Sequence, residues 1–311
     1  MDIKEVRFGG HYSASRDKPG KAPGTTMTAI TKRIVELKWT CFQIFFGSQK
    51  SYNRKNPTAA DRKMCKDLLD EHNIGFYTHF PYTLNLTKLG VRIDALQTEL
   101  TRIAPMGGRC VIHPNSYTDA KYSNKQVAKL IDTDPTHAKV VQWRLDYMKA
   151  IDNIVANIES LNLPDNIDCP LLLEPPAGEG KKFGWRMEQL RELFNRLPDN
   201  VGLCIDTCHL FSAGECRFDI PDAVDKFFAD LDAAVGLKKV KLVHLNDSEG
   251  DFCCMTDNHA PLTSGYIWGK EENLDGLIRL WQLCRQHGID IVSEVSSEVD
   301  HKVMELVNKI K

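Results

Sequence analysis

The stretch V-G-L-C-I-D-T-C-H-L-F-S-A-G, residues 201–214, joins an apolar run to a polar turn. We predict a buried strand over residues 201–205, followed by a turn towards a helix. Asp206 and His209 stand at the end of this strand, three residues apart. A carboxylate and an imidazole at the carboxyl end of a buried parallel strand suit a hydrolytic metal site. Because an isolated D-x-x-H pair is weak evidence, the interpretation depends on how the other strands end.

The composition is that of an ordinary globular protein. The 311 residues are 42% hydrophobic and 26% charged, and this length allows one large α/β barrel as well as two domains. A formal net charge of −2 does not by itself indicate a nucleic-acid binder. The first residues have no apolar signal-peptide core, and no apolar stretch approaches the roughly 20 residues of a membrane span. We therefore expect a soluble, intracellular protein with no membrane partner.

The ten cysteines do not form a recognisable zinc-finger pattern. Most of them stand inside strand-like or helix-like runs, as Cys41 and Cys110 do, and the adjacent Cys253 and Cys254 would make a strained disulfide with each other. We expect reduced thiols that act mainly as small core residues.

A short apolar run, a polar loop and a segment of helical periodicity recur along the whole chain. The predicted strands cover residues 6–8, 40–46, 75–78, 109–112, 170–173, 201–205, 241–243 and 290–293. The predicted helices cover residues 25–37, 60–71, 89–103, 136–160, 187–197, 222–234, 274–287 and 299–310. Alternating strands and helices predict a parallel sheet, and eight repeats predict a closed (β/α)8 TIM barrel, with residues 1–311 as a single domain. The active site of such a barrel lies at the carboxyl ends of its strands.

Six of the eight predicted strands are followed at once by a histidine or a carboxylate: His79, His113, Glu174, Asp206, His244 and Glu294. Any one of them could be the polar start of a loop. As a set, with three residues of the rare histidine type, they indicate a built site.

Three further residues extend the set: His209, Asp257 and His259. Asp257 and His259 are two residues apart, so in an extended segment both would point to one side and could chelate one ion. A solvated loop is the alternative for this pair. The mixture of five imidazoles and four carboxylates suits zinc, with manganese or iron as alternatives. Nine ligands exceed the needs of one ion and, with a bridging carboxylate, match three.

Several motifs resemble those of the endonuclease IV family of apurinic/apyrimidinic endonucleases, from Gly9 to Glu294. The motifs are G-G-H-Y-S (9–13), T-H-F-P-Y-T-L-N-L (78–86), V-I-H-P-N-S (111–116), L-L-L-E-P-P-A-G-E-G (171–180), C-I-D-T-C-H-L-F-S-A-G (204–214), H-L-N-D-S (244–248) and D-N-H (257–259). The resemblance covers nearly the whole chain, and its 204–214 motif is highly specific.

The resemblance implies a TIM barrel that holds three zinc ions. His79, His113 and Glu174 would hold one ion; Glu174 would bridge to a second, shared with Asp206, His244 and Glu294; and His209, Asp257 and His259 would hold the third. The opening pair, Asp206 and His209, would then serve different ions, and Cys204 and Cys208 would be packing residues. Three divalent ions carry more positive charge than four carboxylates carry negative charge, so the mouth would be electropositive. His11 would be either a partner of the ligands or a barrel-core residue.

The resemblance also implies duplex DNA with abasic sites as the partner, and a cytoplasmic or other DNA-containing location. Tyr82 would enter the duplex at the abasic gap, with Gln49 and Lys50 in a second penetrating loop. Packing against the loop below is the alternative for Tyr82. Lys181 belongs to a set of basic loop residues that could contact phosphates, although each alone could be a solvated charge; the others are Lys18, Lys21, Arg54, Lys55 and Lys182, together with Lys50.

The chain departs from the family pattern near these predicted contacts. Asn258 stands where the family has an arginine, Pro175 and Pro176 follow Glu174, and residues 262–268 differ from the family's loop. All nine ligand positions are kept. These changes therefore concern the grip on DNA rather than the metal chemistry.

The activity implied is hydrolysis 5′ to an abasic site by a metal-bound hydroxide, with a 3′-hydroxyl product and an accompanying 3′-trimming activity. We expect a monomer, because the sequence shows no dimer signature. Glu174 and Glu294 would be the catalytic carboxylates, with Glu294 orienting the hydroxide. The alternative enzyme is a xylose-isomerase-like sugar isomerase or epimerase, which would need one ion held by Glu174, Asp206, His244 and Glu294. A barrel that binds DNA or stores zinc without catalysis is a third interpretation, which the complete ligand set disfavours.

Overall fold

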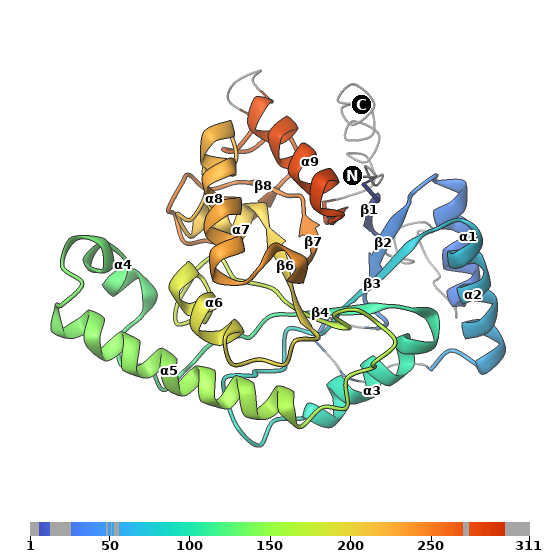
Figure 1. Cartoon of the computed structure of the whole chain (residues 1–311), viewed down its shortest axis with the longest axis horizontal. Helices are drawn as coiled ribbons and strands as arrows, with labels where there is room; N and C mark the ends of the chain where they lie inside the picture. Colours follow the sequence, from blue (N-terminus) through green and yellow to red (C-terminus); the bar gives the residue numbers. More distant parts are fainter. Residues whose placement is uncertain are drawn as a thin grey trace.

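A closed barrel of eight parallel strands forms the centre of the computed structural model, which describes residues 6–12, 26–47, 49–50, 52, 56–269 and 274–295. The strands lie in the ring order β1, β10, β7, β6, β5, β4, β3, β2. Their bounds are β1 Phe8–His11, β2 Cys41–Ile44, β3 Gly75–His79, β4 Arg109–Ile112, β5 Leu171–Leu173, β6 Val201–Asp206, β7 Val240–His244 and β10 Asp290–Ser293. The predicted TIM barrel is confirmed, and each predicted strand overlaps one strand of the barrel (Figure 1).

Helices surround the barrel, with α1 packed beside α2 and α8 beside α9 (Figure 1). Their bounds are α1 Met27–Glu36, α2 Ala59–Glu71, α3 Ile93–Ile103, α4 Asn124–Thr133, α5 Ala138–Glu159, α6 Met187–Phe194, α7 Thr207–Ser212, α8 Pro221–Ala234 and α9 Asp275–His287. Two short 3-10 turns, Ala104–Met106 and Leu237–Lys239, precede β4 and β7. The helix predicted over residues 299–310 lies outside the described residues.

Three differences between the structure and the sequence prediction involve β1, α3 and α4. The first strand runs to His11, whereas the prediction ends it at Phe8. The prediction stops short because Gly9 and Gly10 interrupt the apolar run. A Cβ on Gly9 would collide with the carbonyl oxygen of Cys41, so the close approach of β1 to β2 requires glycine there. The helix predicted from residue 89 begins at Ile93, and α4 was not predicted, although Ser123 and Gln126 form a capping box at its start.

The barrel strands alternate between two environments. One set of side chains, including Phe42, Phe76 and Val243, packs outward in the main core with the helices. The other set forms a separate buried cluster within the barrel: Cys41, Tyr77, Val111, Cys169, Leu172, Cys204, Leu242 and Val292. Residues two positions further along the strands face the same way and therefore form the next layer, at the carboxyl end of the barrel.

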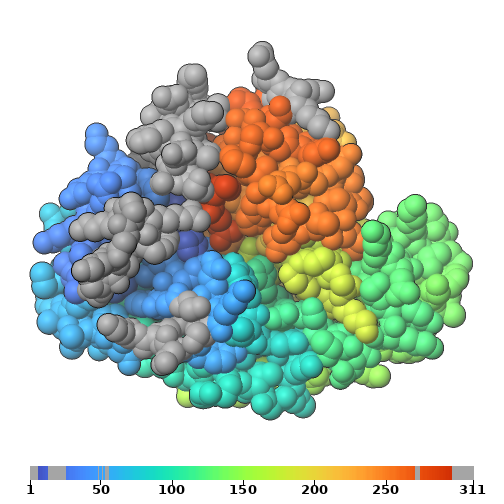
Figure 2. Space-filling model, turned by 180° about the vertical axis from the view of Figure 1, so that it is seen from behind, coloured from blue at the N-terminus to red at the C-terminus, as the bar shows by residue number. Residues whose placement is uncertain are grey.

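Two short elements close over that end of the barrel. Helix α7 starts directly after β6, and the side chain of Asp206 caps it by accepting a hydrogen bond from the backbone N of His209 at 3.0 Å. After β7 the chain forms an antiparallel hairpin of β8 (Asp247–Ser248) and β9 (His259–Ala260). Seen from behind the view of Figure 1, the orange segments of this region lie beside the yellow and green segments of the middle of the chain (Figure 2).

Eight of the ten cysteines are buried, as expected of small core residues, and the structure places none of them in a disulfide. Within the described residues, no helix is long and apolar enough to span a membrane.

Asp247 holds the loop after β9 in place. Its buried carboxylate accepts hydrogen bonds from the backbone N–H groups of Ser248, Gly265 and Ile267 at 2.8, 3.0 and 2.8 Å. The backbone N of Trp268 lies a further 3.4 Å from the same carboxylate, and the Trp268 indole donates to the carbonyl of Phe218. One side chain thereby satisfies the polar backbone of a whole loop.

We predict that Asp247→Ala lowers the free energy of unfolding by about 2 kcal/mol or more, because it leaves several buried N–H groups without an acceptor. Urea denaturation of the metal-free protein measures this effect. Asp251→Ala, which removes an exposed carboxylate whose one hydrogen bond within the described residues is to the backbone N of Phe252, is the control. Equal unfolding midpoints for the two variants would contradict the assigned role.

Candidate metal centre

Eight polar side chains form a ring at the carboxyl end of the barrel, one from each strand or from the residue that follows it. They are His11, Gln43, His79, His113, Glu174, Asp206, His244 and Glu294. Seven of them stand two residues after a member of the interior cluster, as Asp206 stands after Cys204. The period of two in a strand therefore explains why residues far apart in sequence converge here.

Glu174 lies at the centre of the ring, with a side chain that is 1% exposed. Its Oε2 lies 3.1 Å from Nε2 of His79 and 3.3 Å from Nε2 of His113. Its other oxygen, Oε1, lies 2.9 Å from Nδ1 of His244. The two oxygens of one carboxylate thus face two different groups of donors, as a bridging ligand requires.

In three histidines the same ring nitrogen, Nδ1, faces a backbone carbonyl. The Nδ1 atoms of His79, His113 and His209 lie 2.8, 3.2 and 3.0 Å from the backbone carbonyls of Phe80, Glu174 and Pro175. Because a carbonyl only accepts, each Nδ1 carries the proton and each Nε2 presents its lone pair to the cluster. Histidine ligands of metals are commonly held in this way.

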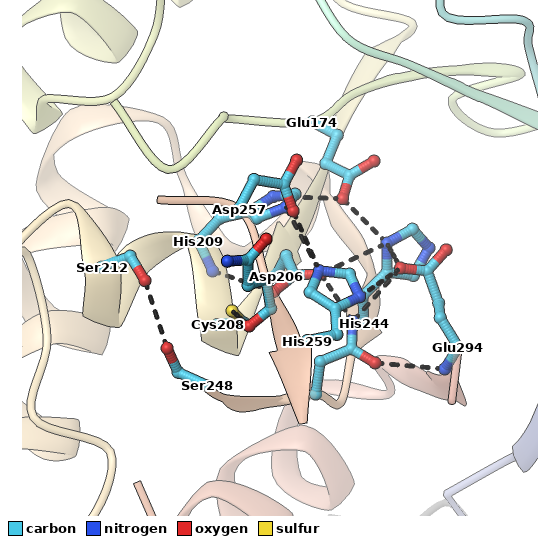
Figure 3. Close-up of polar contacts among 12 residues, drawn as sticks. Glu174, Asp206, Cys208, His209, Ser212, His244, Ser248, Asp257, His259 and Glu294 are labelled. Carbon is cyan, nitrogen blue, oxygen red and sulfur yellow. Dashed lines mark hydrogen bonds and ion pairs between the residues drawn. The ribbon is translucent and has the colours of Figure 1, made fainter. Parts of the chain in front are cut away.

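The side chains of the cluster fall into three groups. Within each group the ligand atoms lie within 4.8 Å of one another. The first group is His79, His113 and Glu174; the second is Glu174, Asp206, His244 and Glu294; the third is His209, Asp257 and His259. Figure 3 shows the second and third groups meeting beside Glu174, with Asp257 and His259 reaching in from the hairpin region. Asp206 and His209 accordingly stand in different groups.

The charges of the ligands favour the binding of a cation. Burial lowers the pKa of His113 to about 4, so this imidazole is neutral and able to donate a lone pair. Burial opposes ionisation of Glu174, but His113 and His244 outweigh it and hold the pKa of this carboxyl well below its usual range. Burial also opposes protonation of His209, yet Asp206 and Asp257 raise its pKa to about 10. The carboxylates around His209 therefore attract positive charge, which a bound cation would supply in place of a proton on this imidazole.

Two thiols approach the ligands without matching them in chemistry. Cys204 lies near Glu174 and His244, and Cys208 lies near Asp206 and His259. Burial raises the pKa of Cys204 to about 12 and that of Cys208 further. Because thiolates rather than thiols bind metals, both cysteines are suited to packing.

Asn246 is a functional residue that the sequence reasoning missed. Its Nδ2 donates to Oδ2 of Asp206 at 2.7 Å and lies 3.1 Å from Oε2 of Glu294. The side chain therefore fixes two carboxylates of the second group relative to each other. The signal was available in the H-L-N-D-S motif, in which Asn246 lies two residues after His244.

The predicted DNA-contacting residues lie in different settings. Tyr82 is 45% exposed, and its ring centroid lies 5.2 Å from that of His79 and 5.7 Å from that of His113, so it packs on the cluster and also faces solvent. Its backbone N donates to the carbonyl of Gln49, which lies with Lys50 in an exposed turn.

The remaining predicted contacts lie on the loops after β5 and β8. The ammonium group of Lys181 donates to the carbonyls of Thr118 and Ala120. Its neighbour Lys182 pairs with Glu179 and lies 3.8 Å from Asp257. Asn258 is exposed, and its carbonyl accepts from the backbone N of Glu249 at 2.9 Å. Lys18, Lys21, Arg54 and Lys55 lie outside the described residues.

Comparisons with known proteins show which proteins this chain is similar to. The family described as "Xylose isomerase-like TIM barrel" matches residues 32–272. A protein named "Probable endonuclease 4" from Haloarcula marismortui is 28% identical over 271 residues, which are 84% of each chain. The crystal structure of endonuclease IV from Thermus thermophilus has a TM-score of 0.74 at 24% identity and covers 98% of each chain. D-psicose 3-epimerase from Clostridium cellulolyticum has a TM-score of 0.52 at 13% identity, over 93% of this chain and 84% of that one.

These likenesses confirm the resemblance to endonuclease IV proteins that the motifs indicate. The epimerase is similar in fold alone.

The three groups differ in exposure, and this difference predicts how they release metal. The Asp257 side chain is 33% exposed, whereas that of Glu174 is 1% exposed. We predict that a zinc-loaded sample challenged with a chromogenic chelator releases metal in a fast and a slow phase. Asp257→Ala should remove the fast phase, and His79→Ala should leave it intact. A single phase, or a fast phase that persists in Asp257→Ala, would contradict the assignment of the third group.

Proposed function

This chain belongs to the family of xylose isomerase-like TIM barrels, and we propose that it is a metal-dependent endonuclease that hydrolyses the phosphodiester 5′ to abasic sites in duplex DNA. The product would carry a 3′-hydroxyl, and the same site would trim blocked 3′ ends. The activity would serve DNA base excision repair. The name of the relative from Haloarcula marismortui supports the general activity.

One observation carries the proposal: nine donors converge in three groups around the two-sided carboxylate of Glu174. The five imidazoles and four carboxylates fit zinc at all three positions, and manganese at one or more of them. Bound ions would activate the attacking water, neutralise the phosphate and stabilise the leaving oxygen. All nine donors come from one chain, which is consistent with a monomer acting in the cytoplasm or another DNA-containing compartment.

The side chains around the cluster have separate tasks in this proposal. Glu294 is fixed by hydrogen bonds from Gln43 to Oε1 and from Asn246 to Oε2. Its side chain is 14% exposed, so the carboxylate lies where it could orient the attacking water. Glu174 would hold the cluster together and set the spacing between the first two groups.

Tyr82 would act on the DNA rather than on the phosphate. Its ring covers His79 and His113 while nearly half of the side chain faces solvent. An aromatic face in this position could fill the space of a missing base and stack on its neighbours. Extruding an abasic nucleotide costs little because no base pair has to be broken.

The alternative function is that of a single-metal sugar isomerase or epimerase. The second group alone, with Glu174, Asp206, His244 and Glu294, would suffice for it. This alternative leaves five inward-facing residues without a ligand role: His79, His113, His209, Asp257 and His259. The nuclease uses all nine, and for this reason we favour it.

Metal analysis combined with cleavage of an abasic duplex oligonucleotide tests the proposal. We predict three metal ions per chain and a single nick 5′ to the abasic site, with none in the undamaged duplex. Glu174→Ala should abolish nicking, because it removes the carboxylate shared by two groups. Glu215→Ala, which removes a partly buried carboxylate bonded to the backbone N of Met187, is the matched control and should still nick. One metal per chain and no nicking by the wild type would overturn the proposal.

Tyr82 offers a test of DNA engagement. We predict that Tyr82→Ala lowers kcat/KM on abasic duplex by about 10- to 100-fold, corresponding to the roughly 1–3 kcal/mol of a lost base–aromatic contact. Tyr82→Phe keeps the ring and should stay within about threefold of the wild type. If Tyr82→Ala cleaves as well as Tyr82→Phe, the side chain serves only to pack on the loop beneath it.

A further inference from the structure

Gln43 belongs to the ring of strand-end residues but is not one of the nine candidate ligands. It lies in β2, two residues after Cys41, and its side chain is fully buried inside the barrel. Its Oε1 lies 3.0 Å from Nε2 of His244, and its Nε2 lies 2.9 Å from Oε1 of Glu294. One amide therefore joins two members of the second group.

The chemistry of the partners fixes the direction of these hydrogen bonds. The ionised Glu294 only accepts, so the amide nitrogen of Gln43 must face it. The amide oxygen then faces His244 and only accepts, so His244 must donate from Nε2. Nδ1 of His244 is consequently the nitrogen left to face Oε1 of Glu174, at 2.9 Å.

The second N–H of the same amide faces His11. Nδ1 of His11 lies 3.1 Å from Nε2 of Gln43, which completes the hydrogen bonding of the amide. His11 thus supports the ligands through Gln43, and the structure gives it the role of a partner to the ligands.

His244 differs from three other histidines of the cluster. Backbone carbonyls hold His79, His113 and His209 at Nδ1 and leave Nε2 for the cluster. A side chain holds His244 at Nε2 and leaves Nδ1. The orientation of the His244 ring therefore depends on which side chain stands at position 43. The orientation of the other three rings depends on backbone carbonyls, which every residue has.

We propose that Gln43 is a positioning residue that determines which nitrogen of His244 and which oxygen of Glu294 face the ion of the second group. This inference rests on the metal centre of the proposed function. Loss of the amide would free the His244 ring to exchange its two nitrogens and would release Glu294 from one of its two anchors. Residues that orient metal ligands in this way typically contribute about 10- to 100-fold to metal affinity.

Gln43→Met tests the proposal, because it preserves the length of the side chain and removes its hydrogen bonds to His244, Glu294 and His11. The matched control is Gln189→Met, which removes another buried glutamine. Gln189 lies in the first turn of α6, and its Oε1 accepts a hydrogen bond from the backbone N of Gly184. Zinc affinity is measured by competition with a chelator, and the His244 nitrogens are observed by 15N NMR of the zinc-loaded, histidine-labelled full chain. Thermal unfolding of the metal-free proteins reports stability separately.

We expect Gln43→Met to bind one ion about 10- to 100-fold more weakly and to lose the wild-type signal of a His244 ring protonated at Nε2. Gln189→Met should lower stability while leaving zinc affinity and the His244 signal unchanged. Wild-type affinity and an unchanged His244 signal in Gln43→Met would overturn the assignment. If the wild type binds one ion, in the second group, and Gln43→Met binds it more weakly, the nuclease proposal is rejected and the role of Gln43 is kept. If the wild type binds three ions and Gln43→Met binds them equally well, the role of Gln43 is rejected and the nuclease proposal is kept.

Discussion

The burial of Glu174 among imidazoles is the interaction on which the rest of the structure depends. An ionised carboxylate inside a protein is costly unless charged or polar partners compensate it. His79 and His113 face one oxygen of Glu174 and His244 faces the other, each through a nitrogen that can bind a metal ion, so a cation bound between them would balance the charge of this carboxylate. Each of those rings is oriented by a hydrogen bond from its opposite nitrogen. The barrel therefore builds a rigid, negatively charged centre. This centre is suited to binding several cations and would be unfavourable without positive charge beside it.

The second group of ligands is the one that both candidate functions would use, and the first and third groups are additions to it. The second group comes wholly from strand ends, on β5, β6, β7 and β10, and it matches the single-metal alternative. The first group adds the ends of β3 and β4, and the third adds the first turn of α7 and the hairpin region. In this account, two further histidine-rich groups placed beside one barrel site favour phosphodiester chemistry over sugar chemistry.

Much of this arrangement could be predicted because it follows from periodicity. Apolar runs marked the eight strands, and a polar residue after six of them marked the ring. Gln43 escaped because it lies within a run that reads as continuously apolar, and only the register with Cys41 shows that it faces inward. Asn246 escaped because its role depends on the separation of Asp206 from Glu294, which no local pattern encodes. Lys181 and Lys182 are equivalent in sequence, yet only Lys182 lies near the cluster.

The most direct test of the central claim is anomalous diffraction from a zinc-soaked crystal, measured on both sides of the zinc absorption edge. We predict three anomalous peaks at the barrel mouth. Two of them should lie about 2.0–2.2 Å from different oxygens of the Glu174 carboxylate, the usual distance for zinc and oxygen. A single peak among Glu174, Asp206, His244 and Glu294, with His79, His113 and His209 unligated, would contradict it.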